Sequence, residues 1–167
     1  MNDKINTEFR EAMSRLAGGV AIATTIIEGR PWGVTMTSCC SLSMDPPMIL
    51  ICVAKHNYAT QYFIKSSTFG VNFLAVSQTS VAAFASKKGS PKFLDNHDAG
   101  ESDSLRLKEA VAFVECTLDR VIAAGDHYIV IGRVGEVGLG APAKPLVYYS
   151  RDFCSVAVGT TQLAQVG

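Results

Sequence analysis

Residues 32–47, WGVTMTSCCSLSMDPP, give the strongest indication of fold and function in this chain. The segment holds one charged residue, Asp45, and five hydroxyl side chains: Thr35, Thr37, Ser38, Ser41 and Ser43. It lies between the apolar runs 20–27 and 48–54, where a buried strand would carry branched or aromatic residues. A dense row of uncharged donors suits an anionic or heteroaromatic ligand that lies along the backbone.

This hydroxyl row, residues 35–43, allows two interpretations. It can form a bed for a flavin or a phosphate, in which backbone N–H groups and hydroxyls bond the ring edge and the ribityl chain. It can equally be a half-buried strand whose hydroxyls bond their own backbone. Composition alone leaves both interpretations open.

The overall composition limits the class of protein. The 167 residues are 48% apolar with a mean hydropathy of +0.21, which fits one domain, residues 1–167, with a sizeable core. Lysine and arginine number 15, as do aspartate and glutamate, so the formal net charge is zero. Nucleic acid is therefore not the expected partner, because phosphate neutralisation needs clustered positive charge. A neutral, apolar-rich chain also favours an oligomer, which covers part of the surface.

The cysteines indicate a reduced protein without a metal. Their number is odd and no C-x-x-C pair occurs, which argues against a disulfide framework and a zinc site; they are Cys39, Cys40, Cys52, Cys116 and Cys154. Residues 1–13 contain no apolar core of a signal peptide, and no apolar run is long enough to span a membrane. We therefore expect a cytoplasmic protein.

Periodicity predicts a mainly β protein with inserted helices. Helices are expected at 7–16, with Asn6 or Thr7 as the cap, at 58–65, and at 77–85, with Ser77 as the cap. Strands are expected at 20–27, 32–37, 48–53, 69–74, 112–123, 128–137 and 146–149, and a long loop at 86–107. The turn at 28–31 predicts that the first two strands form a hairpin.

Short strands at close spacing favour an antiparallel β-barrel over a parallel βαβ sheet. The dinucleotide fingerprint G-x-G-x-x-G and the P-loop motif G-x-x-x-x-G-K-[ST] are both absent. Any nucleotide must therefore be bound by something other than a Rossmann turn or a P-loop.

Three further segments are candidates for chemistry. Lys55-His56-Asn57 lies between a strand and a helix, where a cation can bind phosphate, or it is a solvated strand end. Residues 86–90, SKKGS, can hold a dinucleotide phosphate or be an ordinary solvated loop. His127, in a tight strand connection, can meet a ligand with Asp126 orienting its ring, or can be an exposed turn residue. No Ser/His/Asp series or paired catalytic carboxylates are recognisable.

Together these sequence segments resemble those of the short-chain flavin reductases, the reductase components of two-component flavin-dependent monooxygenases. The segments that carry the resemblance are 33–41 (GVTMTSCCS), 43–47 (SMDPP), 69–74 (FGVNFL) followed by Gln78 and Phe84-Ala85, and 125–134 (GDHYIVIGRV). Their order and spacing extend from about residue 9 to 153. The resemblance implies an antiparallel split β-barrel of the FMN-binding type. It also implies a homodimer with the flavin, FMN or FAD, near the interface.

The resemblance assigns roles to individual residues. It places Thr35, Met36, Thr37, Ser38 and Ser41 along the isoalloxazine and ribityl chain, and Cys52, Val53, Ala54 and Lys55 toward the phosphate, with Lys55 as the cation. It adds Asn57, Tyr58 and Thr60 from the following turn, Ser86, Lys87 and Lys88 near the phosphate or the adenylate of FAD, and Arg151. His127 is the catalytic residue and meets the nicotinamide. Where such proteins often have an Arg-x-Ser-type step, this chain has Lys55-His56-Asn57, so FMN and FAD both stay open. Cys39 and Cys40 are expected to serve packing rather than redox chemistry.

The implied reaction is hydride transfer from NADH or NADPH to the flavin. The protein contributes orientation, exclusion of water and hydrogen bonds to the reduced ring, so no acid or base motif is required. Reduced flavin then diffuses to a separate oxygenase. Two alternatives stay open: a reductase that retains its flavin and reduces another acceptor, and a non-catalytic flavin-binding electron carrier.

Overall fold

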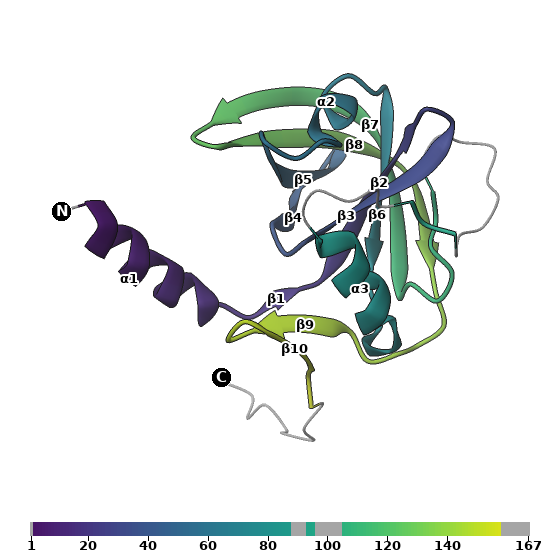
Figure 1. Ribbon diagram of the computed structural model, residues 1–167. Coiled ribbons are helices and arrows are strands. Elements are labelled where there is room, and N and C mark those ends of the chain that lie inside the picture. The colour runs from purple at the N-terminus through teal and green to yellow at the C-terminus, as the bar shows by residue number, and fades with distance from the viewer. Residues whose placement is uncertain (1, 88–92, 96–104, 158–167) are drawn as a thin grey trace, which may run out of the picture.

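The computed structural model describes residues 2–87, 93–95 and 105–157. Two sheets and three α-helices make up this part of the chain (Figure 1). The helices are α1 (Asn2–Ser14), α2 (Thr60–Phe63) and α3 (Thr79–Ser86), and a short 3₁₀ turn, η1 (Val76–Gln78), precedes α3. The strands are β1 (Gly18–Gly19), β2 (Ala21–Ile27), β3 (Arg30–Met36), β4 (Cys39–Met44), β5 (Pro47–Ala54), β6 (Thr68–Phe73), β7 (Ala112–Ala124), β8 (His127–Leu139), β9 (Leu146–Tyr149) and β10 (Asp152–Ser155).

The larger sheet is antiparallel throughout, with the strand order β3-β2-β6-β7-β8-β5-β4. The two edge strands, β3 and β4, are consecutive in the chain, and only Thr37 and Ser38 lie between them. In a flat sheet, seven strands would separate these edges by about 29 Å. The step from Met36 to Cys39 spans at most about 11 Å. The sheet must therefore roll up until its edges meet, which confirms the predicted split-barrel class.

The rolled sheet has apolar clusters on both of its faces. Ile51, Phe69 and Val130 lie in the inner cluster, and none of them is exposed to solvent. On the other face, Ile22 and Leu107 pack with residues of α3 in a second buried cluster. Because β2 is sandwiched between the two clusters, nearly all of its residues are buried. That position explains its continuous apolar and β-branched sequence.

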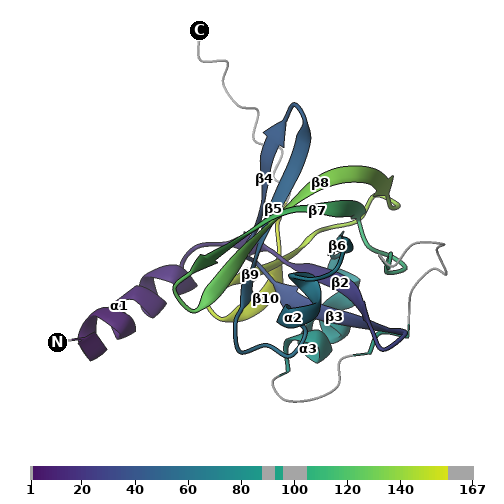
Figure 2. The ribbon, with the colours of Figure 1, turned by 90° about the horizontal axis from the view of Figure 1, so that it is seen from above.

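The smaller sheet, β1-β9-β10, lies at the end of the molecule from which α1 extends (Figures 1 and 2). Ser150 and Arg151 form the β9–β10 turn, with φ angles of 51° and 64°. The amide of Ser150 donates to the carbonyl oxygen of Ser14 at 2.7 Å, and the Arg151 guanidinium contacts the Glu11 carboxylate at 2.7 Å. The turn thus holds the end of α1, while the rest of this helix projects from the body.

Most of the expected strands are confirmed, and β2 and β3 form the expected hairpin. Two strands, β1 and β10, were not expected, and β4 occupies the hydroxyl row, for which a strand was one of two open interpretations. The helix at 58–65 is limited to the four residues of α2. The cap expectations were wrong: Thr7 lies inside α1 and donates to Asp3 O, and Ser77 lies in η1. Gln78 precedes α3 and its side chain accepts from the amide of Ala75.

None of the helices in the described ranges is long and apolar enough to cross a lipid bilayer.

Asn72 anchors an irregular segment onto the sheet. Its side chain, fully buried in β6, donates to Leu105 O at 3.0 Å and accepts from the amide of Leu107 at 2.7 Å. Thr24 donates to the same Leu105 oxygen at 2.9 Å. These bonds satisfy buried backbone groups of residues 105–107, which lie outside the named strands.

We predict that Asn72→Ala lowers the free energy of unfolding by about 2–3 kcal/mol, because it leaves a buried amide without an acceptor. Urea denaturation followed by circular dichroism measures the change. Thr79→Ala is the control, because its exposed hydroxyl bonds only Val76 O, and it should cost at most about 0.5 kcal/mol. A loss below that of the control would show that Asn72 does not anchor the segment.

Candidate functional site

The hydroxyl row lies where the sheet edges meet. It runs from the end of β3, through the connection Thr37-Ser38, into β4. Thr37, Ser38 and Ser41 are exposed, whereas Thr35 is partly buried. The structure therefore combines the two sequence interpretations: β4 is a strand, and most of its side chains are open to solvent.

Several hydroxyls of the row already have partners in the protein. Thr35 donates to Ala82 O in α3 at 2.7 Å, and Ser38 donates to Cys52 O in β5 at 3.1 Å. The Ser41 hydroxyl faces the sulfur of Met44 at 3.9 Å. The Cβ of Thr37 lies against Gly18, where an added Cβ would approach it to 3.0 Å. The hydroxyl protons of Thr35 and Ser38 thus serve the fold, and a ligand there would meet their lone pairs or the backbone.

The backbone at this place offers donors that the fold does not use. β3 and β4 each pair with one neighbour only, so each has an open edge. The start of β3 is covered on that edge, because Trp32 bridges Phe93 and the amide of Leu94 donates to Pro31 O at 3.0 Å. The end of β3 and the whole of β4 have no such neighbouring strand among the described residues. Open edges present N–H and C=O groups in a row, which suits the polar rim of a flat heteroaromatic ring.

Strand β5 leads from the hydroxyl row to a charged cluster. Ser38 is bonded to Cys52 in both directions, with the Cys52 amide donating to Ser38 O at 2.9 Å. Lys55 lies three residues further along, about 10 Å at the rise of a strand. In the same register, Ala54 is paired with His127. The structure therefore brings together the hydroxyl row, residues 52–55 and His127, as the sequence analysis expected.

Lys55, Asp126 and His127 form what we call the strand-end cluster. The Lys55 amide donates to Asp126 O at 2.9 Å, and its ammonium group donates to Gly125 O at 2.6 Å. That ammonium group also lies 5.2 Å from the centre of the Tyr128 ring. The lysine side chain is exposed, so these contacts position its charge without burying it.

The His127 ring is oriented by its neighbour. Its Nδ1 lies 2.7 Å from an Asp126 carboxylate oxygen, and its side chain is 42% exposed. The hydrogen bond from His127, followed by the positive charge of that ring, holds the pKa of the Asp126 carboxyl below its usual value. The carboxylate thus remains an acceptor for Nδ1, and Nε2 is the ring nitrogen left for a ligand.

In the turn after β5, the polar side chains of Asn57 and Thr60 form hydrogen bonds to nearby backbone groups. The side chain of Asn57 accepts from the amide of Ala59 at 3.1 Å, and Thr60 donates to Ala54 O at 2.6 Å. Tyr58 is half exposed, and its hydroxyl lies 3.2 Å from that of Tyr62. Of the three residues expected to contact the ligand from this turn, Tyr58 alone presents an exposed side chain.

Three of the expected cofactor-binding residues have buried side chains. Met36 and Val53 belong to the inner cluster, with 8% and 2% of their surface exposed, and Thr60 is 3% exposed. Any contact of Met36 or Val53 with a ligand would therefore involve their backbone.

The remaining expected residues lie apart from the strand-end cluster. Ser86 ends α3 and donates to Ala83 O, and the ammonium group of Lys87 lies 5.8 Å from the centre of the Phe84 ring. Lys88 lies outside the described residues. Arg151 contacts Glu11 of α1, in the β9–β10 turn.

The cysteines beside the site differ in exposure. Cys39 packs against the inner cluster, as expected, and burial first, then the neighbouring Cys40 and Cys52, raises its pKa to about 12. Burial likewise raises the pKa of Cys116 to about 12. Cys40 is exposed, so the expectation that it serves packing was wrong. At neutral pH the thiols of Cys39 and Cys116 stay protonated, and a redox role for them is not supported.

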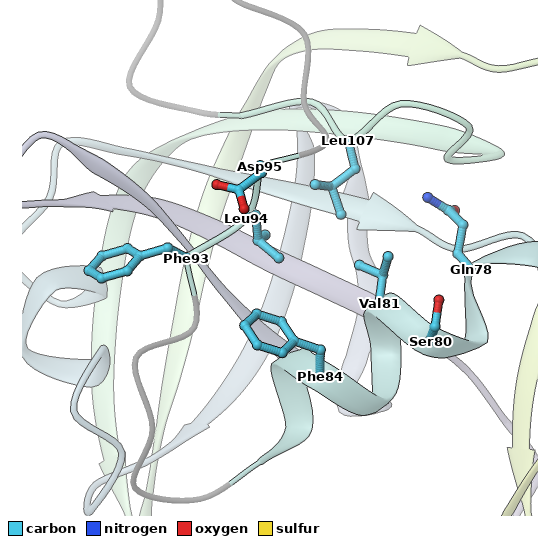
Figure 3. Close-up of a pocket in the computed structure, with 8 residues that line it drawn as sticks. All are labelled: Gln78, Ser80, Val81, Phe84, Phe93, Leu94, Asp95 and Leu107. Atoms are coloured by element: carbon cyan, nitrogen blue, oxygen red, sulfur yellow. The ribbon is translucent and has the colours of Figure 1, made fainter.

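Two features near the site were missed at the sequence level. The Nε1 of Trp32 is buried and has no hydrogen-bond partner among the described residues, although the ring packs against Tyr58 and Phe93. The second is a pocket beside α3 whose lining includes Phe84, Asp95 and Leu107 (Figure 3). The lining comes from three separate segments, 78–84, 93–95 and 107, so no local motif reveals this pocket.

Chemically, the arrangement fits a flavin better than a metal. Unused backbone donors, exposed hydroxyls and one positioned cation match an uncharged polar ring with a phosphate tail. Within the described ranges, no group of three or more His, Cys, Asp or Glu side chains is placed to hold a metal ion.

The fold and this site define an antiparallel split-barrel protein with a place for a flat polar ligand. The chain belongs to the flavin reductase like domain family, which matches residues 13–157.

Individual relatives are similar to this chain along most of their length. The chain is 35% identical over 154 residues to an actinorhodin polyketide dimerase of Streptomyces coelicolor, covering 89% of this chain and 87% of the relative. It is 32% identical over 145 residues to the reductase component of 4-hydroxyphenylacetate 3-monooxygenase from Thermus thermophilus, covering 87% and 93%.

A solved structure extends the agreement to three dimensions. The NADH:FAD oxidoreductase of Streptomyces globisporus, determined with NAD and FAD fragments, superposes with a TM-score of 0.85 at 27% identity. The match covers 94% of this chain and 96% of that chain.

Proposed function

We propose that this protein is an NAD(P)H:flavin oxidoreductase that reduces FMN or FAD and releases it to a separate monooxygenase. Membership of the flavin reductase family, with relatives that are reductase components, supports the reaction class. The observation that carries the proposal is the meeting of two open sheet edges beside β5, which ends at the strand-end cluster.

In the proposed site, each part of the chain has a separate task. Amides of the open edges at 36–41 bond the ring edge, where they stabilise the charge that reduction places on it. The Lys55 ammonium group attracts the phosphate, and the Nε2 atom of His127 orients the nicotinamide. A bound flavin supplies the hydride-accepting ring. The protein therefore orients two ligands and excludes water between them.

The charges of the site favour loose flavin binding. Lys55 is exposed and shares its ammonium group with Gly125 O, so its attraction for a phosphate is screened by water. A weakly held flavin can leave after reduction, as delivery to a separate oxygenase requires.

Oxidation of NADH and of NADPH at 340 nm, with FMN, FAD, riboflavin or no flavin added, tests the proposal. We expect turnover that depends on added flavin and saturates with it. Reduction of a single equivalent of tightly bound flavin without further turnover would instead indicate an electron carrier. Absence of both flavin binding and turnover would contradict the proposed function.

His127→Ala tests the role of the ring. We expect the KM for the nicotinamide nucleotide to rise about tenfold, the effect of losing roughly 1.4 kcal/mol of binding, and the flavin Kd to stay within twofold. Asp126→Asn should raise the same KM by a smaller factor, because the ring remains but loses its acceptor. A raised flavin Kd with an unchanged nicotinamide KM would rule out the nicotinamide role.

We also propose that the protein is a homodimer, with α1 in the interface. The apolar side chains of this helix are exposed, Ile5 at 62%, Phe9 at 62% and Met13 at 45%, and so is Leu16 just after its end, at 65%. Figure 1 shows the helix extending away from the body of the protein. Such an uncovered apolar stripe on a helix is typical of a surface that a partner covers.

Sedimentation equilibrium tests the dimer. We expect twice the chain mass for the native protein, and the monomer mass for the double variant Phe9→Glu, Met13→Glu. Glu8→Gln changes the polar side of the same helix, where the residue pairs only with Lys4, and should remain dimeric. A monomeric native protein would contradict the proposal.

We further propose a cytoplasmic location, in keeping with five cysteines that are all free thiols, the state that a reducing compartment maintains. When cells are lysed directly into denaturant that contains an alkylating reagent, all five thiols should be labelled, and a disulfide between any two would contradict this location.

A further inference from the structure

An exposed thioether lies at the end of the hydroxyl row. Met44 is the last residue of β4, and it is 83% exposed. Figure 2 shows that the β4–β5 hairpin, which carries it, projects from the body of the protein. Met44 is the most exposed methionine in the part of the chain that the structure describes: Met13 is 45% exposed, Met36 is 8% exposed, and Met48 is partly buried. Packing in a core therefore does not explain a methionine at this place.

A β-bulge brings Met44 to the side of Ser41. The pairing of β4 with β5 shifts its register between Ser41 and Ser43, which leaves Leu42 outside the ladder. Residues three apart in a regular strand face opposite sides, but the extra residue of a bulge returns them to the same side. The Ser41 hydroxyl donates to the sulfur of Met44 at 3.9 Å. The thioether is thus in contact with one of the hydroxyls proposed to bind the flavin.

The oxidation state of this sulfur decides how strongly it holds the hydroxyl. A thioether sulfur is a weak hydrogen-bond acceptor, so the Ser41 hydroxyl can turn to a ligand at little cost. Oxidation to the sulfoxide adds an S=O oxygen and makes the side chain polar. That oxygen is a strong acceptor, and a hydroxyl bonded to it is no longer free for a flavin. Oxidation of Met44 therefore removes one donor from the hydroxyl row.

We propose that Met44 is an oxidation site whose sulfoxide captures the Ser41 hydroxyl and weakens flavin binding. The inference rests on the proposed function, because reduced flavin that meets no oxygenase reacts with dioxygen. Dioxygen takes two electrons and two protons from it, which yields hydrogen peroxide and oxidised flavin. The Met44 sulfur then attacks one peroxide oxygen. The O–O bond breaks, an S–O bond forms, the sulfur loses two electrons, and the other oxygen leaves as water with both peroxide protons.

This oxidation limits the waste of NAD(P)H. Peroxide from unused product forms close to the flavin site, and the β4–β5 hairpin is part of that site. A protein oxidised at Met44 binds flavin less tightly and so reduces less of it at low flavin concentration. Methionine sulfoxide reductases return the side chain to the thioether, so the effect is reversible.

The nearby thiols are less suited to this role. A thiol reacts as its thiolate, and burial first, then the neighbouring thiols, raises the pKa of Cys39 to about 12. A thioether has no proton to lose, so its reaction with peroxide does not require an ionised form. Cys40 is exposed and can also be oxidised, but its sulfenic acid is reversed by added thiols, whereas methionine sulfoxide requires its own reductase.

Peptide mass spectrometry and FMN titration of the full-length protein, after treatment with millimolar hydrogen peroxide, test the proposal. We expect Met44 to be oxidised first, and Met36 to be oxidised roughly tenfold more slowly because it is buried. The Kd for FMN should rise about fivefold, the effect of losing one hydrogen bond. Dithiothreitol alone should not restore the Kd, and added methionine sulfoxide reductase should restore it.

Three variants separate the role of the sulfur from general damage. Met44→Leu keeps an apolar side chain without a sulfur, and its Kd for FMN should not respond to peroxide. Met13→Leu removes a different exposed thioether and should respond as the native protein does. Ser41→Ala should raise the Kd about fivefold before any treatment, and oxidation of Met44 should change it no further, because the hydroxyl is already absent.

Four results would overturn the oxidation site. They are oxidation of Met44 no faster than that of Met36, oxidation of Met44 without a rise in the Kd for FMN, a rise in Met44→Leu equal to that of the native protein, and the same further rise in Ser41→Ala.

Failure of this proposal and of the proposed function would look different. Flavin-dependent turnover with a Kd for FMN that ignores the oxidation of Met44 would overturn the oxidation site alone. A Kd that responds to this oxidation, in a protein without flavin-dependent turnover, would overturn the proposed function and leave the oxidation site standing. No binding of FMN before or after treatment would overturn both.

Discussion

The rest of the structure depends on the two-residue connection between β3 and β4. Thr37 and Ser38 join strands at opposite edges of a seven-stranded sheet. This short tether cannot span a flat sheet, so the sheet curls until Met36 and Cys39 are within reach of each other. The paired hydrogen bonds between Ser38 and Cys52 then fix the connection against β5. Rolling the sheet creates the enclosed inner cluster and, at the same time, leaves two open edges next to each other.

The candidate site follows from this constraint rather than from a catalytic motif. Strand edges that nearly meet retain unused N–H and C=O groups, which elsewhere on a protein surface would invite aggregation. Small hydroxyl residues at this place keep the edges polar and leave room for a ligand. The same strand, β5, that receives Ser38 also carries Lys55 to the side of His127. One short connection thus sets the distance between the edges proposed to bind the ring and the residues proposed to meet the phosphate and the nicotinamide.

Much of this arrangement could be predicted from the sequence, because the signals are local. Three local features indicate strands in a protein without βαβ repeats. They are the apolar β-branched run of β2, the prolines at the start of β5 and the apolar alternation of β6. β4 was left open between a ligand bed and a half-buried strand because its Ser and Cys residues lack the branched and aromatic character of a buried strand. As an exposed edge strand, it does not need a buried face. β10 was missed because its turn uses Ser150 and Arg151 at positive φ in place of the usual Asn-Gly. Contacts with α1 hold that turn, and no local pattern reveals them.

The site residues, too, could be predicted only where the signal is local in the sequence. Spacing along the chain predicts Lys55 and His127 as site residues, because both follow recognisable strand ends. It could not show that the hydroxyl protons of Thr35 and Thr60 are used inside the protein, since Ala82 lies 47 residues from Thr35 and its carbonyl is placed there by α3. The pocket of Phe84 and Asp95 likewise depends on Leu107, which Asn72 holds from another strand.

Amide hydrogen exchange with and without FMN tests most directly whether the open edges form the flavin site. The account predicts that amides of residues 36–41 and 52–55 exchange more slowly when FMN is present, while those of α1 do not change. Protection confined to other segments, with fast exchange retained at 36–41, would contradict the central claim that rolling the sheet forms the flavin site.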